Sequence, residues 1–139
     1  MRKSLFLLLL VLMLLSLTAC YRSEATAPTE NTMVISLLNN AKFAIDQFEI
    51  QTIYTGGGMM YADGTNIRKG DIMSMVFTDK EDFDLKGSED FSFYAIREDG
   101  RRISLGHQTL ELTPNHSYLF EVRGNTADNA HLVAVESDQ

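Results

Sequence analysis

Six carboxylates crowd one short stretch of this chain, and carboxylate oxygens are ligands that calcium prefers. They are Asp79, Glu81, Asp82, Asp84, Glu89 and Asp90. Counted from Asp82, the spacing begins like a calcium-binding loop, but Lys86 stands fifth and Phe93 stands twelfth, where a carboxylate is needed. The sequence therefore favours a solvated acidic loop at 79–90 over a specific calcium site. The side chains kept as candidates for weak cation binding are Asp79, Glu81, Asp82 and Asp84.

The other side chains that could do chemistry lack the neighbours that the chemistry needs. His107, His116 and His131 have no histidine or cysteine two or four positions away, so a zinc site would need a tertiary coincidence. No serine stands in a Gly-x-Ser-x-Gly or Ser-x-x-Lys pattern. The glycines at 56–58 are not followed by the Gly-Lys-Ser or Gly-Lys-Thr of a phosphate-binding loop, and we expect a plain loop there. We therefore predict no catalytic residue, metal site or cofactor, and no enzyme; an enzyme with an unrecognised site remains an alternative.

Met59, Met60 and Tyr61, which follow the three glycines, are the best candidates for a contact loop. Flexible thioethers and a tyrosine on a mobile loop adapt to varied partners. The alternative is that these apolar side chains fold back over the end of the domain.

The only cysteine, Cys20, directly follows a segment with the layout of a secretory leader. Arg2 and Lys3 form a basic start, and the apolar stretch at 5–17 is too short to span a bilayer core of about 30 Å. With its single cysteine at this position, the chain that follows has no disulfide and no thiolate to bind a metal.

The segment Leu17-Thr18-Ala19-Cys20 resembles the lipobox of bacterial lipoproteins, and the resemblance covers residues 1–20. It implies a signal peptide at 1–19 and Cys20 as the first mature residue, with an S-diacylglycerol and an N-acyl group. Two or three acyl chains hold a protein to a membrane far more firmly than one. The implied location is the outer face of the cell membrane, or the outer membrane if the host has one. The alternative is an ordinary signal peptide followed by a free thiol.

The chain after the leader is acidic. Removing residues 1–19 takes away two of the twelve basic residues and none of the nineteen acidic ones, which leaves a net charge of about −9. Such a chain repels phosphate backbones, so we expect no nucleic acid partner. Residues 20–32 are small and polar with one proline, and we expect a flexible tether that reaches at most about 40 Å. Residues 33–139 suffice for one domain.

From residue 33 onward the pattern is strand after strand, without a sustained helical stripe. Asp99-Gly100 is the strongest hairpin signal, because both residues tolerate positive φ. The expected strands are 33–38, 45–54, 71–78, 91–98, 102–112 with a kink at Gly106, 117–123 and 131–136. These strands, about seven in number, and the lack of crossover helices predict an all-β fold, an antiparallel β-sandwich.

The segment Leu112-Thr113-Pro114-Asn115-His116-Ser117-Tyr118 resembles the Leu-x-Pro-x-x-x-Tyr segment of fibronectin type III and immunoglobulin-like domains. In those domains it forms the tyrosine corner, in which the tyrosine hydroxyl bonds to backbone a few residues upstream. The resemblance implies an immunoglobulin/fibronectin III-like architecture and this bond for Tyr118.

Together these features predict a membrane-anchored cell-envelope lipoprotein whose non-catalytic β-sandwich binds, or presents to, an envelope protein partner. The first alternative is a ligand- or divalent-ion-binding module that uses the loop at 79–90. Counting strand reversals also predicts an orientation. The tether, the loop at 55–70, the Asp99-Gly100 turn and the loop at 124–130 should share the membrane-facing end, and the acidic loop should lie at the other end.

Overall fold

The structure is a computed structural model that describes residues 23–135. The predicted leader at 1–19 and the predicted lipidation site Cys20 lie outside the described residues. Apart from one 3-10 turn, η1 at Ala127–Asn129, every regular element is a strand. The strands are β1 Thr32–Asn39, β2 Gln47–Gln51, β3 Gly56–Met60, β4 Ile72–Thr78, β5 Ser88–Ile96, β6 Arg102–Glu111, β7 His116–Arg123 and β8 His131–Ala134.

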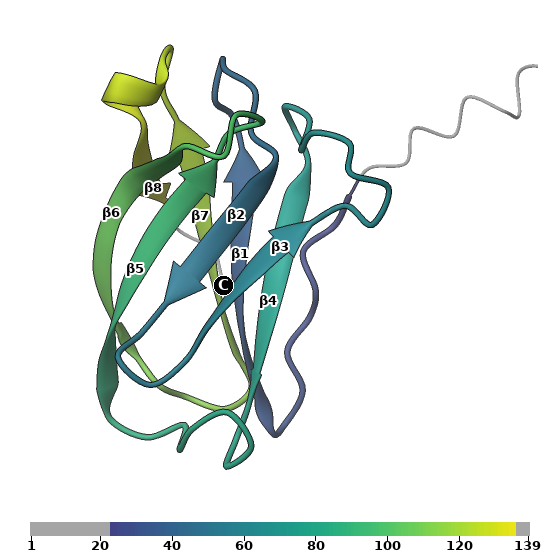
Figure 1. The fold of residues 1–139 in the computed structure, drawn as a ribbon. Coiled ribbons are helices and arrows are strands. Elements are labelled where there is room, and N and C mark those ends of the chain that lie inside the picture. Colours follow the sequence, from purple (N-terminus) through teal and green to yellow (C-terminus); the bar gives the residue numbers. More distant parts are fainter. Residues whose placement is uncertain (1–22, 136–139) are drawn as a thin grey trace, which may run out of the picture.

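The strands form two sheets of four that pack face to face (Figure 1). One sheet has the order β4-β1-β7-β8 and the other has the order β3-β2-β5-β6. All neighbours are antiparallel except β1 and β7, which run parallel. The all-β fold and the two-layer architecture are therefore as predicted from the sequence.

The strand number and order differ from the expectation. Residues 23–135 contain eight strands, because β3 forms where a loop was expected. In an immunoglobulin constant domain the first, second, fifth and fourth strands share a sheet, whereas here β1 lies between β4 and β7. The parallel β1–β7 pair joins segments far apart in the chain, and parallel pairing requires such a long connection. Local alternation cannot specify this pairing.

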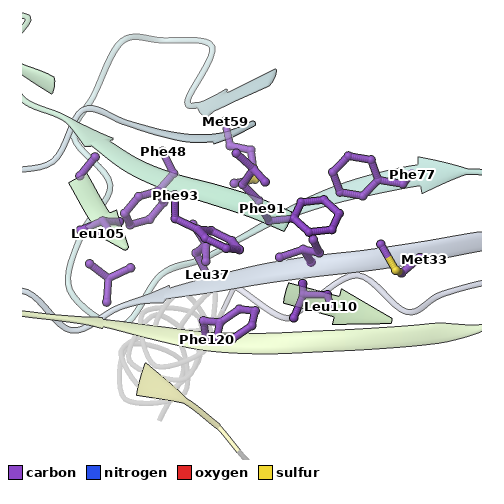
Figure 2. Close-up of a cluster of buried hydrophobic side chains, with 14 of the residues drawn as sticks. Met33, Leu37, Phe48, Met59, Phe77, Phe91, Phe93, Leu105, Leu110 and Phe120 are labelled. Carbon is purple, nitrogen blue, oxygen red and sulfur yellow. The ribbon is translucent and has the colours of Figure 1, made fainter. Parts of the chain in front are cut away.

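The core between the sheets is built from inward-facing side chains of both layers (Figure 2). In β7, the alternating residues Tyr118, Phe120 and Val122 face inward, since all three belong to or pack against the core. A chain of aromatic contacts crosses the core, with centroid distances of 5.4 to 6.5 Å. Its members are Phe83, Phe77, Phe91, Phe93 and Phe120. Buried aromatic pairs at such distances stabilise a core beyond the area that they bury.

The glycines of β3 are a correction to the sequence prediction of a loop at 55–70. Residues 56–60 pair with β2 along its whole length, and each glycine accommodates a neighbouring side chain. A Cβ on Gly58 would lie 2.1 Å from Gln47 Nε2, and one on Gly57 would lie 2.9 Å from Met75 Cε. The glycines therefore leave room for the ends of these side chains over β3, although glycine is a poor strand former.

Other strand predictions are closer. The strand expected at 45–54 ends at Gln51, after which residues 52–55 turn into β3. The hairpin at Asp99-Gly100 is confirmed, because it joins the paired strands β5 and β6, and Gly100 has a φ of 78°. The predicted kink at Gly106 coincides with a register shift in this pair. A bulge of this kind lets one long strand follow the curved sheet.

The segment expected to be a flexible tether is bound to the sandwich from Ser23 onward, and we call residues 23–31 the strap. The strap lies beside β4 (Figure 1). The Ile72 N–H donates to Ser23 Oγ at 2.6 Å, and the Thr26 N–H donates to Ser74 Oγ at 3.0 Å. A turn then reverses the chain into β1, with the Thr32 N–H bonded to the Thr29 carbonyl at 3.1 Å.

Candidate functional site

The two ends of the sandwich differ in chemistry. One end, which we call the acidic end, carries the turn at 52–55, the loop at 79–87 and the loop at 112–115. The other, which we call the Asp71 end, carries the loops at 40–46, 61–71, 97–101 and 124–130. The predicted separation of the loop at 55–70 from the acidic loop therefore holds for residues 61–70, whereas residue 55 lies in the turn at the acidic end and residues 56–60 form β3. The acidic loop itself is shorter than predicted, because Glu89 and Asp90 belong to β5.

The candidate cation ligands at the acidic end are partly occupied by the loop's own backbone. Asp79 Oδ1 accepts the Leu85 N–H at 2.9 Å, and Asp82 Oδ2 accepts the Thr78 N–H at 2.7 Å. Glu81 and Asp84 are exposed. Nowhere in residues 23–135 do three side chains of histidine, cysteine, aspartate or glutamate converge as a metal site requires. Asp79 and Asp82 therefore stabilise the conformation of the loop by accepting hydrogen bonds from its backbone.

The turn at 52–55 displays two large apolar side chains at the same end of the sandwich as the acidic loop. Ile53 is 80% exposed and Tyr54 is 73% exposed, more than any other large apolar side chain in the described part of the chain. Thr52 closes the turn, because its Oγ1 accepts the N–H groups of Tyr54 and Thr55 at 3.1 Å. Two adjacent large apolar side chains in water make this turn a candidate contact site.

Sequence reasoning missed this pair. Because residues 45–54 alternate, the sequence predicted one strand over this range, and Ile53 and Tyr54 were assigned to that strand instead of to a turn. The available signal was the run Thr52-Ile53-Tyr54-Thr55 directly before the glycines. Threonine side chains often bond to nearby backbone in turns, so two threonines around an apolar pair are compatible with an exposed tip.

At the Asp71 end, one carboxylate organises the loop at 61–71. Asp71 Oδ2 accepts the Tyr61 hydroxyl at 2.7 Å and the Arg68 N–H at 2.9 Å, and Arg68 Nε lies 3.4 Å away. The buried Asn39 binds the other side of the same loop, donating from Nδ2 to the Ile67 carbonyl at 2.8 Å. A hollow of about 560 Å³ borders this loop at Tyr61, Asp63, Gly64, Thr65, Asn66 and Arg68.

These contacts shift the ionisation of the buried acid. Burial by itself raises the pKa of Asp71, but the hydrogen bonds from Tyr61 and from the backbone and side chain of Arg68 outweigh it. The net pKa of Asp71 is therefore lowered. In the same contact, burial and the Asp71 carboxylate raise the pKa of Tyr61. The hydrogen bonds of this loop therefore stabilise the ionised form of Asp71.

The three predicted contact residues are separated by the structure. Met59 lies in the core and is 7% exposed, so assigning it to a contact loop was wrong. Tyr61 is half-buried with its hydroxyl bonded to Asp71, and Met60 alone of the three is largely exposed, at 52%. The alternation of β3 explains this, because adjacent residues of a strand point to opposite faces.

The bond implied for Tyr118 is present. Its hydroxyl donates to the Glu111 carbonyl at 2.9 Å, seven residues upstream, across the loop that joins β6 to β7. Its half-buried ring stacks on Phe120 with a centroid distance of 6.4 Å. Burial raises the pKa of Tyr118. The residue thus links the two sheets at the acidic end, since β6 and β7 belong to different layers.

The histidines remain on separate elements. His107 Nδ1 lies 2.9 Å from Ser92 Oγ on the outer face of the β5–β6 pair. His116 contacts the ring of Tyr118, and His131 Nδ1 lies 2.9 Å from the Asn129 carbonyl. Serine and histidine in contact can form a nucleophile and base. Here Ser92 is half-buried and His107 is exposed, on the outer side of a regular sheet.

The comparisons with known proteins find likeness only among solved structures. No protein-family model matches this chain, and no curated protein matches it. Among solved structures, it is similar to one described as the NMR structure of the protein from Eubacterium rectale. That likeness has a TM-score of 0.48 at 11% identity and covers 78% of this chain and 93% of the other. Within residues 23–135, no helix is both long enough and apolar enough to cross a membrane.

Proposed function

We propose that this chain is an exported lipoprotein, anchored to a membrane through lipid on Cys20, whose sandwich binds a protein partner in the cell envelope without catalysis. The anchor rests on the lipobox-like segment at 17–20. The binding role rests chiefly on Ile53 and Tyr54, which the turn at 52–55 exposes to solvent. Burial of an apolar side chain is stabilising. In this chain alone Ile53 and Tyr54 are not buried, and a pocket on a partner would bury them.

The charge around this pair indicates which partner fits. Between residues 79 and 90, six carboxylates are accompanied by two lysines. A partner surface with an apolar pocket and a basic rim would complement both features. Such complementarity mainly raises the association rate and excludes wrong partners, while the apolar anchors supply affinity.

The likeness to fibronectin type III and immunoglobulin-like domains is proposed at the level of architecture only. It is supported by the bond of the Tyr118 hydroxyl to the Glu111 carbonyl. Many cell-surface domains share the sandwich architecture without sharing strand order.

Photo-crosslinking in the native host tests the binding role. A photoreactive residue replaces Tyr54 in one variant and Met60, also exposed but at the other end, in the control. We expect one crosslinked partner at position 54 and none at position 60, with the crosslinked peptide of the partner rich in lysine or arginine. Ile53→Ser and, separately, Asp84→Lys should abolish the product.

Ile53→Ser is a clean variant for this purpose. Because Ile53 is 80% exposed, the substitution should change the free energy of unfolding by no more than about 0.5 kcal/mol. Equal crosslinking at positions 54 and 60, or a product that is a second copy of this chain, would argue against the proposed partner.

A further inference from the structure

The strap fixes where the proposed anchor meets the sandwich. It runs parallel to β4, because Ser23 bonds to Ile72 at the start of β4, and the Asn31 carbonyl accepts the Asp79 N–H at 2.9 Å beyond the end of β4. The turn into β1 thus lies at the acidic end, and the strap carries the chain back to the Asp71 end. Without the strap contacts, the chain would leave from the acidic end.

The distance between Cys20 and the first bound residue is short. Three residue steps separate Cys20 from Ser23, so they span at most about 10 Å. A free segment of residues 20–32 would instead reach about 40 Å and would let the domain rotate. We infer that the strap holds the anchored sandwich upright, with its Asp71 end against the lipid headgroups and its acidic end facing away. This inference rests on the proposed anchor at Cys20.

The charges at the two ends agree with this orientation. In the four loops of the Asp71 end, five basic side chains nearly balance six acidic ones. Four of the five basic ones are exposed, and they are Lys42, Arg68, Lys69 and Arg101. The residues from 79 to 90 carry three times as many acidic as basic side chains. An anionic membrane surface repels the second end more strongly than the first.

The orientation also places the proposed contact pair. Ile53 and Tyr54 lie at the acidic end, so they would face away from the membrane and be reachable by a partner in the envelope. Strands of this length separate the two ends by roughly 25 Å. The partner would therefore bind well clear of the lipid surface.

Depth-dependent quenching tests the orientation without relying on lipidation in cells. A chain that begins at Cys20 contains every described residue, and its thiol is coupled to a maleimide lipid in phosphatidylcholine vesicles. A fluorophore is attached through an azide-bearing residue at position 69 or at position 86. Both positions hold exposed lysines, so the charge change is the same. Lipids with a nitroxide on the headgroup serve as the quencher.

We expect loss of fluorescence at position 69 and little loss at position 86. Ser23→Ala combined with Thr26→Pro removes the hydroxyl acceptor and the N–H donor that dock the strap, and should abolish the difference between positions. Ala27→Pro is the matched control, because the Ala27 N–H makes no hydrogen bond within residues 23–135, and it should keep the difference.

Quenching at position 86 that equals or exceeds quenching at position 69 in the unsubstituted chain would overturn the inference. An unchanged difference in the Ser23→Ala/Thr26→Pro variant, verified as folded by circular dichroism, would also overturn the role of the strap. Neither result tests the proposed lipidation of Cys20 in cells, because in this experiment the lipid is coupled to the thiol in vitro. Conversely, a native chain found without lipid would sink the proposed anchor and leave the vesicle result to decide the strap.

Discussion

At the scale of single residues, Tyr118 shows that a short sequence motif can predict the hydrogen-bond partner of one hydroxyl group. The proline and tyrosine of the segment at 112–118 predicted a bond to upstream backbone, and the hydroxyl meets the Glu111 carbonyl. The motif is informative because its parts are close in sequence. Proline fixes φ in the connecting loop, and the tyrosine ring is directed inward by strand alternation.

We expect Tyr118→Phe to lower the free energy of unfolding by about 1 kcal/mol, which is typical of one lost hydrogen bond with partial solvent access. Tyr94→Phe is the matched control. Its ring lies 3.5 Å from the Arg102 guanidinium carbon, its hydroxyl has no hydrogen bond within the described residues, and the substitution keeps the ring. Urea unfolding of the two variants decides the matter, and equal losses would mean that the Glu111 bond contributes nothing measurable.

At the scale of elements, the loop at 61–71 depends on one charged carboxylate. The lowered pKa of Asp71 means that folding favours its ionised form. For an acid whose pKa is depressed on folding, the added stability is fully present above the unfolded value, about 3.9, and is lost as the pH falls through the folded value. Acidification below about pH 4 should therefore loosen this loop.

We expect Asp71→Asn to reduce stability at pH 7 by about 1 to 3 kcal/mol, because the charged acceptor of Tyr61 and Arg68 is lost. The gap between Asp71→Asn and the unsubstituted chain should shrink at pH 3, because the unfolded chain there gains protons that the folded carboxylate resists, and the stability given by the ionised form falls. Glu98→Gln, an exposed acid in the β5–β6 turn, controls for net charge. Thermal unfolding at both pH values measures the gap, and a gap that is constant with pH would contradict this account.

β3 illustrates why one element escaped sequence reasoning. Three consecutive glycines carry no alternating pattern, and glycine is depleted in strands. The strand forms through its pairing with β2, and the side chains of Gln47 and Met75 use the space that the glycines leave open. That reason exists only once the neighbouring strands are in place.

At the scale of the whole molecule, the strap joins the proposed anchor to one end of the sandwich. The sequence predicted that the tether and the loop at 55–70 share an end, from strand counting alone. The junction with β1 in fact lies at the acidic end, and the hydrogen bonds at Ser23 and Thr26 return the chain to the Asp71 end. The start of the strap and the loop at 61–70 thus do lie at the same end, but the cause is the docking of the strap and not the number of strand reversals.

We expect Cys20→Ser to release the chain from the membrane or to leave the precursor uncleaved, because thioether attachment of the diacylglyceryl group requires the thiol. Membrane fractionation and intact-mass measurement check this. Ser23→Ala is a nearby control that keeps the thiol. Recovery of the unsubstituted chain from membranes without added acyl mass would contradict the proposed lipidation.

What the sequence determined by itself is local or periodic. Alternation specified most strands and the inward face of β7, Asp99-Gly100 specified its hairpin, and the segment at 112–118 specified the Tyr118 bond. Tertiary structure decided the parallel β1–β7 pair, the burial of Met59, the exposure of Ile53 and Tyr54, and the docking of the strap. Each of these depends on which distant segments become neighbours, and backbone hydrogen bonding between strands is available to any sequence that the core brings together.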